Sequence, residues 1–411
     1  MTEDGAAGDA ALLSLIRPLA DMPGDLAVAV SGGSDSMAAL HLLARAFGPR
    51  LHAVTVDHGL RAEAADEARF VGQVCAGLGV SHRVLVWQHG ALAGNLQDKA
   101  RQARYGLIGG WARGAGLSRV VVAHTADDQA ETLLMGLARG AGIDGLAGMR
   151  PCWQAEGLTW LRPFLTTPRE ALRAYLRRHG QGWRDDPSNE DDRFTRVRAR
   201  RALKALAPLG ITGGRLAAVA GHLAQARQAL DRAADEALAF CTDEAAGALT
   251  LHPGRFATLP PETARRLVLG ALRWIAGTPH PPRQADLDRL IAAIGAGRDA
   301  TLAGCRLIGR TATLCREERA VAAHTTPTHA VWDGRWSLCG PHDPALHLGA
   351  LGAEGLRLCP GWRATGLHRA VLAATPAVWD GPRLVAAPLA GLSAGWQAIC
   401  PPVGTAFNKV H

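Results

Sequence analysis

The strongest constraint on the fold is a regular alternation of short apolar runs with longer helical patterns across the first 125 residues. Strands that alternate with helices in this way are typical of a parallel sheet covered on both faces. Because ligands bind at the carboxyl ends of such strands, the residues that follow each strand are the first candidates for a site. The pattern predicts an α/β fold with strands at 26–30, 51–56, 83–86 and 119–123, one helix ending at Phe47, and further helices at 62–78 and 96–113.

The segment Ser31-Gly-Gly-Ser-Asp-Ser36 connects the first predicted strand to the first predicted helix. Its two glycines allow the backbone to approach an anion closely, and successive N–H groups at a helix N-terminus form a phosphate cradle. Asp35 would repel phosphate unless Mg²⁺ lay between them, so it is a candidate metal ligand. The simpler alternative is an ordinary strand–helix turn in which Ser34 is the N-cap.

A second polar segment, residues 124–132, follows the fourth predicted strand. Its acidic residues Asp127, Asp128 and Glu131 share one side of a helix, because residues three and four apart are neighbours there. Clustered carboxylates can bind a metal or an amine, or act as a general base. With equal weight, Thr125 and Asp128 fit a capping box, in which the acids serve only to start the helix.

Basic side chains dominate the segment 193–204, which contains no acidic residue. Such clusters supply sequence-independent affinity for a nucleic-acid backbone. The chain has 45 basic and 37 acidic residues, and the resulting charge of +8 is compatible with that partner. A solvated helix face is the alternative interpretation. The side chains concerned are Arg193, Arg196, Arg198, Arg200, Arg201 and Lys204, with Arg101 and Arg104 on the predicted helix 96–113.

The pattern changes after residue 208, from alternating elements to amphipathic helices and then to a region rich in Gly and Pro. Short apolar runs in the last region predict a small β-containing domain. A chain of 411 residues is long enough for two or three domains. The predicted helices span 216–240, 262–275 and 284–294, a linker is expected at 324–329, and the predicted domains are 1–210, 211–323 and 330–411.

Composition excludes several classes of protein. Hydrophobic residues make up 48% of the chain and charged residues 20%, which rules out disorder, collagen and coiled coil. No apolar run approaches the roughly 18 residues of a membrane span, and no basic region precedes the N-terminal apolar stretch, so we expect a cytoplasmic location. The eight cysteines include no C-x-x-C pair, so neither a zinc ribbon nor a redox pair is predicted.

The loop at 31–36 resembles the pyrophosphatase loop of N-type ATP pyrophosphatases, the PP-loop superfamily, which cleave ATP between its α and β phosphates. Further segments make the chain similar to the tRNA(Ile)-lysidine synthase family over about residues 26–201. Val197 departs from that family, which usually has Asn at this place. The matching segments are Val56-Asp-His-Gly-Leu-Arg61, Gly94-Asn-Leu-Gln97, Ala100-Arg-Gln-Ala-Arg-Tyr105, His124 to Thr132, Arg139-Gly-Ala-Gly142, Gly145-Leu-Ala-Gly-Met149, Arg162-Pro163 and Asp186-Pro-Ser-Asn189.

The resemblance implies a Rossmann-like PP-loop domain, a helical tRNA-binding domain and an enzyme that uses ATP and Mg²⁺. Its reaction would ligate free L-lysine to C2 of the wobble cytidine of a tRNA(Ile) with a CAU anticodon, giving lysidine, AMP and diphosphate. A homodimer is a further expectation. A tRNA-thiolating PP-loop enzyme and a non-catalytic module that binds ATP or tRNA are the alternatives. The expected ATP-binding residues are Ser31, Gly32, Gly33, Ser34, Asp35, Ser36, Asp57 and His58; the expected catalytic residues are Asp35, His124, Asp128 and Glu131, with Asp35 on the metal; and the expected tRNA-binding residues are Arg101, Arg104, Arg193, Arg196, Arg198 and Arg201.

Overall fold

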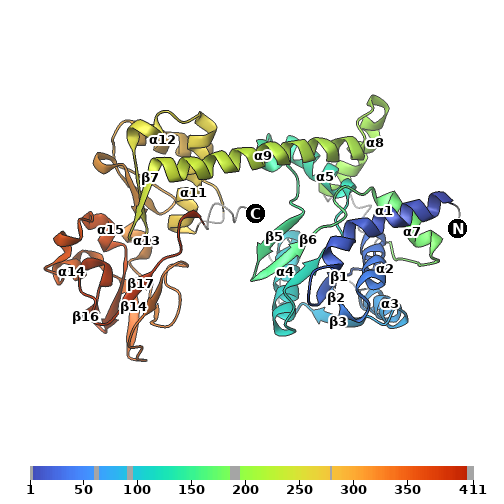
Figure 1. Cartoon of the computed structure of the whole chain (residues 1–411), viewed down its shortest axis with the longest axis horizontal. Helices are drawn as coiled ribbons and strands as arrows, with labels where there is room; N and C mark the ends of the chain where they lie inside the picture. Colours follow the sequence, from blue (N-terminus) through green and yellow to red (C-terminus); the bar gives the residue numbers. More distant parts are fainter. Residues whose placement is uncertain (1–2, 60–63, 90–95, 186–194, 278–279, 405–411) are drawn as a thin grey trace. The chain divides into compact units, whose positions relative to one another are not determined.

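The computed structural model describes residues 3–59, 64–89, 96–185, 195–277 and 280–404 (Figure 1). The chain forms two compact units, one up to Arg227 and one from Gln228 onward. The boundaries of the three predicted domains stay a prediction. No helix in the described ranges is long and apolar enough to cross a membrane.

The first unit is built on a six-stranded sheet with the order β3-β2-β1-β4-β6-β5. All neighbouring strands are parallel except β5, which pairs antiparallel with β6. The predicted parallel α/β fold and its four strands are therefore confirmed. The strands are β1 (Leu26–Ala29), β2 (Leu51–Asp57), β3 (Ser81–Val86), β4 (Arg119–Val121), β5 (Cys152–Ala155) and β6 (Leu158–Leu161).

Helices cover both faces of this sheet (Figure 1). Apolar side chains of α1, α2, α3 and α7 form one core with Leu26 and Val28 of β1, whereas α4 packs with Ala27 on the other face. This alternation follows from the two-residue period of a strand. The helices are α1 (Glu3–Ala20), α2 (Ser34–Phe47), α3 (Ala64–Gly77), α4 (Leu96–Gly114), α5 (Ala126–Leu137), α6 (Ile143–Leu146), α7 (Arg169–Arg178) and α8 (Thr195–Leu206), with short 3₁₀ turns η1 (Gly48–Arg50) and η3 (Ala207–Leu209).

The strand order reverses between β1 and β4. From β1 the chain continues to β2 on one side, whereas β4 has β6 as its other neighbour. Loops that leave two adjacent strands at such a switch point diverge, and ligands of α/β proteins bind between them. The loop at 31–36 follows β1 and the segment 124–132 follows β4, so both candidate segments flank the same point of the sheet.

The second unit contains antiparallel sheets in addition to the predicted helices. A five-stranded sheet with the order β7-β8-β11-β10-β9 packs against α11 and α12, and a four-stranded sheet with the order β12-β14-β15-β16 follows. The helices predicted at 216–240, 262–275 and 284–294 are confirmed as α9 (Gly213–Cys241), α11 (Pro261–Ala276) and α12 (Gln284–Gly295). The five strands within 211–323 were not predicted from the sequence.

The predicted linker at 324–329 is wrong in one respect, because it contains β12, which pairs with β14. The β-containing character of the last region is confirmed. The remaining elements are β7 (Thr242–Ala245), β8 (Ala248–Leu251), α10 (Pro253–Phe256), β9 (Ala300–Leu302), β10 (Cys305–Ile308), η4 (Gly309–Thr311), β11 (Thr313–Arg316), α13 (Glu318–Val321), β12 (Thr326–Pro327), β13 (Ser337–Cys339), β14 (Leu346–Ala350), α14 (Gly352–Arg357), η5 (Trp362–Thr365), α15 (Arg369–Ala373), β15 (Pro376–Asp380), β16 (Arg383–Ala386), η6 (Pro388–Ala390) and β17 (Gln397–Ile399).

Candidate active site

The loop at 31–36 adopts the conformation that a phosphate cradle needs. Gly32 has a φ of 87°, a backbone angle that residues with a side chain rarely adopt, and Gly33 is the N-cap of α2. The predicted N-cap at Ser34 is wrong, because Gly33 holds that position and α2 already begins at Ser34. The Ser36 hydroxyl donates to the carbonyl of Gly33 at 3.0 Å and accepts from the backbone N–H of Ser31 at 3.1 Å. Since the N-cap is a glycine and supplies no side-chain acceptor, the first N–H groups of α2 are available to an anion.

The capping box predicted at the start of α5 is present. Thr125 is the N-cap, and the Oδ2 atom of Asp128 accepts hydrogen bonds from the backbone N–H of Thr125 at 2.8 Å and from its hydroxyl at 2.9 Å. The Oδ1 atom of Asp128 lies 4.0 Å from a guanidinium nitrogen of Arg196. The capping oxygen Oδ2 of Asp128 thus also lies 3.4 Å from Arg169, and Oδ1 faces Arg196.

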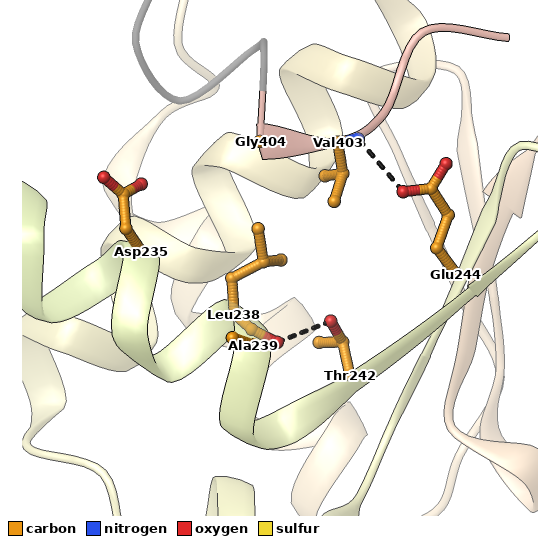
Figure 2. Close-up of a pocket in the computed structure, with 7 residues that line it drawn as sticks. All are labelled: Asp235, Leu238, Ala239, Thr242, Glu244, Val403 and Gly404. Carbon is orange, nitrogen blue, oxygen red and sulfur yellow. Dashed lines mark hydrogen bonds between the residues drawn. The ribbon is translucent and has the colours of Figure 1, made fainter.

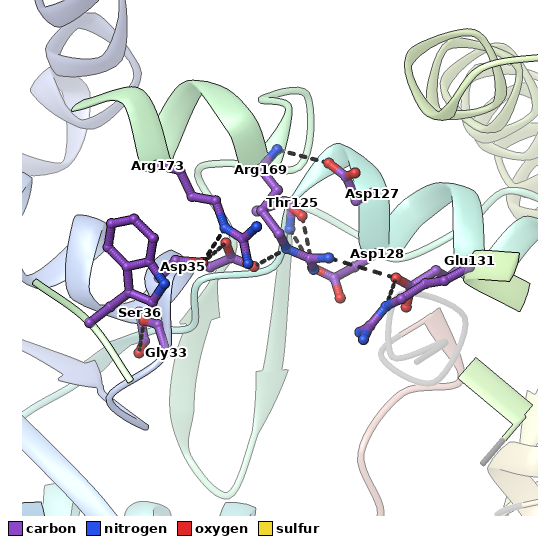
Figure 3. Close-up of polar contacts among 12 residues, drawn as sticks. Gly33, Asp35, Ser36, Thr125, Asp127, Asp128, Glu131, Arg169 and Arg173 are labelled. Atoms are coloured by element: carbon purple, nitrogen blue, oxygen red, sulfur yellow. Dashed lines mark hydrogen bonds and ion pairs between the residues drawn. The ribbon is translucent and has the colours of Figure 1, made fainter. Parts of the chain in front are cut away.

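Arg169, at the start of α7, joins the two candidate segments (Figure 3). Its Nε donates to Asp35 at 2.8 Å, one terminal nitrogen lies 3.4 Å from Asp128, and the other lies 3.9 Å from Glu131. Its backbone N–H donates to the carboxylate of Asp127 at 2.8 Å. Arg169 was not singled out from the sequence, because these contacts join residues up to 134 positions apart and no local motif marks them.

Burial and the shared guanidinium act in opposite directions on the pKa values of the carboxylates around Arg169. Burial raises the pKa of Asp35 even though Arg169 opposes the rise. Burial also disfavours the ionised form of Asp128, but the charge of Arg169 and the hydrogen bonds from Thr125 outweigh it and lower the pKa of Asp128. Two carboxylates in one cluster therefore have pKa values pushed in opposite directions, which is typical of sites that move protons.

Glu131 is the most enclosed carboxylate of the cluster, with 1% of its side chain exposed. Its Oε1 atom accepts from Nε of Arg200 at 2.6 Å, while its Oε2 atom has no hydrogen-bond partner among the described residues. Burial raises the pKa of Glu131 against the effect of Arg200. A buried acceptor atom without a donor is costly, so the Oε2 atom is suited to receive a donor from a ligand.

His124 leaves the carboxyl end of β4, and Arg162 leaves the carboxyl end of the neighbouring strand β6. The Nε atom of Arg162 donates to Nδ1 of His124 at 3.0 Å. Burial, reinforced by the positive charge of Arg162, lowers the pKa of His124 to about 3. The imidazole is therefore neutral at physiological pH.

Asp57 and His58 lie at the carboxyl end of β2, on the other side of β1 from the α5 segment. The Asp57 carboxylate accepts from the N–H of Gly59 at 2.8 Å, and a guanidinium nitrogen of Arg104 lies 3.4 Å from Nε2 of His58. A hollow of about 480 Å³ opens beside Asp57 and is lined by Asp57, Ala65, Ala68, Arg69, Gly72, His82 and Val84.

The basic residues divide into two groups. Arg196 and Arg200 face the carboxylates of α5, whereas Arg198 is exposed on α8 and Arg101 is exposed on α4. Val197, at the place where the family usually has Asn, is buried among the first unit's described residues. Arg193 lies outside the described residues.

A second hollow, of about 460 Å³, lies in the second unit (Figure 2). The Thr242 hydroxyl donates to the carbonyl of Leu238 at 2.7 Å, and the N–H of Val403 donates to Glu244 at 3.0 Å. None of the predicted catalytic residues lines it. Its lining residues are Asp235, Leu238, Ala239, Thr242, Glu244, Val403 and Gly404.

Comparison with known proteins places this site in a family. A family profile described as the PP-loop domain matches residues 9–206. A tRNA(Ile)-lysidine synthase from Ruegeria pomeroyi is 50% identical over 385 residues, which are 92% of each chain. The tRNA(Ile)-lysidine synthase of Bradyrhizobium sp. strain BTAi1 is 42% identical over 71% of this chain and 83% of its own.

Among solved structures, a U34-tRNA thiolase from Methanococcus maripaludis matches 54% of this chain and 80% of its own, with a TM-score of 0.47 and 13% identity. That likeness is too slight to carry an argument. The relative that shares half of its residues along nearly the whole length, together with the PP-loop domain that holds the carboxylate cluster, shows that the chain belongs to the tRNA(Ile)-lysidine synthase family.

Proposed function

We propose that this enzyme ligates free L-lysine to C2 of the wobble cytidine of a tRNA(Ile) with a CAU anticodon, with ATP converted to AMP and diphosphate. The observation that carries this proposal is the pairing of two unlike sites at one switch point of the sheet, in a chain half identical to a tRNA(Ile)-lysidine synthase. One site presents backbone donors for phosphates, and the other presents carboxylates for an amine.

The first half of the reaction would occur at the loop 31–36. The C2 oxygen of the cytidine attacks the α-phosphorus of ATP, and the bond to the β-phosphate breaks, releasing diphosphate. The N–H groups at the start of α2 belong to this loop, which suits the negative charge of the leaving group. Arg173 of α7 donates to the Ser34 hydroxyl at 3.2 Å and so adds positive charge beside this loop.

The residues present fit a magnesium ion held jointly by protein and nucleotide. Mg²⁺ usually takes one or two carboxylates and completes its shell with waters and substrate phosphates. Asp35 supplies one carboxylate beside the cradle, and no group of three or more candidate metal ligands occurs in the described part of the chain. Bound there, the ion would neutralise charge on the diphosphate, and Asp35 would exchange its contact with Arg169 for the metal.

The second half of the reaction needs a lysine ε-amine without its extra proton, because an ammonium has no lone pair. Asp128 and Glu131 lie on one side of α5, and the unpartnered Oε2 atom of Glu131 is a ready acceptor for that proton. The amine then attacks C2, a C–N bond forms, and AMP leaves with the former C2 oxygen. The raised pKa of Glu131 makes it a better base for this step than an ordinary carboxylate.

Exposed arginines on α8 and α4 suit the backbone of a tRNA. Arg198 and Arg101 are exposed to solvent, so their guanidinium groups are accessible to phosphates. An anticodon loop offers bases that can be splayed out into a protein site, which a duplex does not. A cytoplasmic location and a homodimer stay predictions.

Two alternatives predict different chemistry. A thiolase would be expected to use paired cysteines near the site, but the two cysteines of the first unit, Cys75 and Cys152, are both free, and Cys75 is buried. A non-catalytic module would have no use for the carboxylate cluster. Pyrophosphate release separates the three hypotheses: we expect it to require tRNA, and turnover beyond one equivalent to require lysine. Release that depends on a sulfur donor, or no release at all, would contradict the proposal.

A further inference from the structure

Arg162 has the contacts of a residue that holds another side chain in place. The residue is 8% exposed, and one terminal nitrogen donates to the carbonyl of Arg150 at 2.8 Å. Its guanidinium lies 3.7 Å from the centroid of the Trp153 ring, which stacks on the fully buried Trp160 at 5.6 Å and 17°. The contact with Trp153 and the hydrogen bond to a carbonyl restrict the guanidinium, and its Nε–H points toward His124.

That hydrogen bond has a fixed direction. A guanidinium carries only donors and does not lose its proton in proteins, so Nδ1 of His124 must be the acceptor. A neutral imidazole that accepts at Nδ1 carries its single proton on Nε2. Within the described ranges the side-chain hydrogen bond of His124 is made at Nδ1, on a half-buried ring, which leaves the Nε2–H available to a ligand.

We propose that His124 acts in the adenylation step as a neutral Nε2–H donor to an oxygen of the reacting α-phosphoryl group, and that Arg162 is the positioning residue that fixes this tautomer. The location supports the partner: His124 follows β4, the immediate neighbour of the strand whose loop forms the phosphate cradle. This role excludes His124 as a general base, because its basic nitrogen is already occupied. The inference rests on the proposed function for the identity of the phosphoryl group.

The charges around His124 agree with a ring that stays neutral. Asp128 on α5 favours its protonation, whereas Arg162 after β6, Arg101 on α4 and Arg196 on α8 oppose it. Burial opposes protonation most strongly, and the pKa of His124 falls to about 3. Replacing Arg162 removes one opposing charge and should raise the pKa of His124.

The tautomer can be read directly by long-range ¹H–¹⁵N NMR on protein labelled in the histidine rings, with the His124→Gln variant used to assign the signal. We expect Nε2 to carry the proton and Nδ1 to be unprotonated at neutral pH, and we expect Arg162→Met to give a mixture of tautomers. A wild-type ring that is protonated at Nδ1, or at both nitrogens, would overturn the inference even if the enzyme makes lysidine.

Single-turnover pyrophosphate release supplies the second readout. The side-chain amide nitrogen of Gln can replace an Nε2–H donor, whereas that of Asn corresponds to Nδ1. Loss of one donor to a developing anionic oxygen costs about 100-fold or more in rate, so His124→Asn and His124→Ala should lose this much, while His124→Gln should stay within about tenfold of wild type. Equal losses in the Gln and Asn variants would contradict the donor role.

Arg162 is tested with a conservative variant and a matched control. Arg162→Met should slow pyrophosphate release, and Arg162→Lys should recover part of the rate. Arg113→Met is the control. Arg113 contacts Glu156 at the turn between β5 and β6, the strand that precedes Arg162, and no contact with His124 is found among the described residues. An Arg162→Met ring that keeps the wild-type tautomer, or an equal effect of the control on the rate, would reduce Arg162 to a packing residue.

Discussion

Removing the guanidinium of Arg169 tests whether one positive charge allows three carboxylates to share the site. In Arg169→Ala, Asp35 and Asp128 lose their ion pairs with Arg169. Asp128 keeps Arg196 at 4.0 Å, and Glu131 keeps its hydrogen bond to Arg200. Breaking a buried pair on one side costs about 3–5 kcal/mol, and the 19% exposure of Arg169 places the expected loss at about 3 kcal/mol. For a protein unit of this size, that corresponds to a fall in Tm of about 6–12 °C.

The loss should depend on pH. In the wild type the pKa of Asp128 is lowered, so its contribution to stability is present at neutral pH and is lost as the pH falls through its folded-state value. Without Arg169, burial and mutual repulsion raise the pKa values of the carboxylates, and groups with raised pKa values regain stability as they become protonated. The difference in Tm between wild type and Arg169→Ala should therefore be larger at about pH 7.5 than at about pH 5.

Scanning calorimetry across this pH range measures the effect. Arg177→Ala is the matched control, because Arg177 lies on the same helix and pairs at 2.6 Å with Glu170, where both side chains are exposed. Exposed pairs contribute about 0–1 kcal/mol, so the control should change Tm by only a few degrees. Equal losses in the two variants, or a loss in Arg169→Ala that does not change with pH, would refute the reasoning.

Three further predictions concern the separate parts of the site. Asp35→Asn should reduce pyrophosphate release by about 100-fold or more while the fold persists, and a rate near wild type would exclude Asp35 from holding the metal. Glu131→Gln should raise the KM for lysine with little change in the KM for ATP; unchanged kinetics with a lower Tm would favour a purely structural role. Replacing Arg198 and Arg201 by Gln should flatten the plot of log tRNA-binding constant against log salt concentration, by about 0.7–0.9 in slope for each phosphate no longer bound. ATP binding should not change. An unchanged slope would identify a solvated helix face.

The catalytic half of the fold was predictable because its strands are apolar runs bounded by turn residues. Two strands of that same half, β5 and β6, were not predictable, and neither were two hairpins of the second unit. The reason lies in their turns. The turns Glu156-Gly157, Ala246-Gly247 and Ala303-Gly304 have φ values between 48° and 73°, as in two-residue hairpin turns of type I′. Such turns are recognised in sequences chiefly by Asn or Asp at the first position, and here that position is Glu or Ala.

The candidate site was predictable to the extent that it lies in contiguous segments. The loop 31–36 and the helix with Asp128 and Glu131 are local patterns, and both lie where the strand order places them. The role of Arg169 was not predictable, because a single arginine at the start of a helix is common and its contacts with the carboxylates form only after folding. The ion pairs of Arg196 and Arg200 with the carboxylates were likewise not predictable, since one helix presents basic side chains both to the carboxylates and to solvent.

The most direct test of the central claim is mass spectrometry of nucleosides from a tRNA(Ile) transcript with a CAU anticodon, after incubation with the enzyme, ATP and isotopically labelled lysine. The account predicts that the wobble cytidine gains the full mass of one labelled lysine less one water, with one AMP and one diphosphate formed for each modified tRNA. A transcript whose wobble cytidine stays unmodified, or gains sulfur or an adenylate alone while lysine is present, would contradict it.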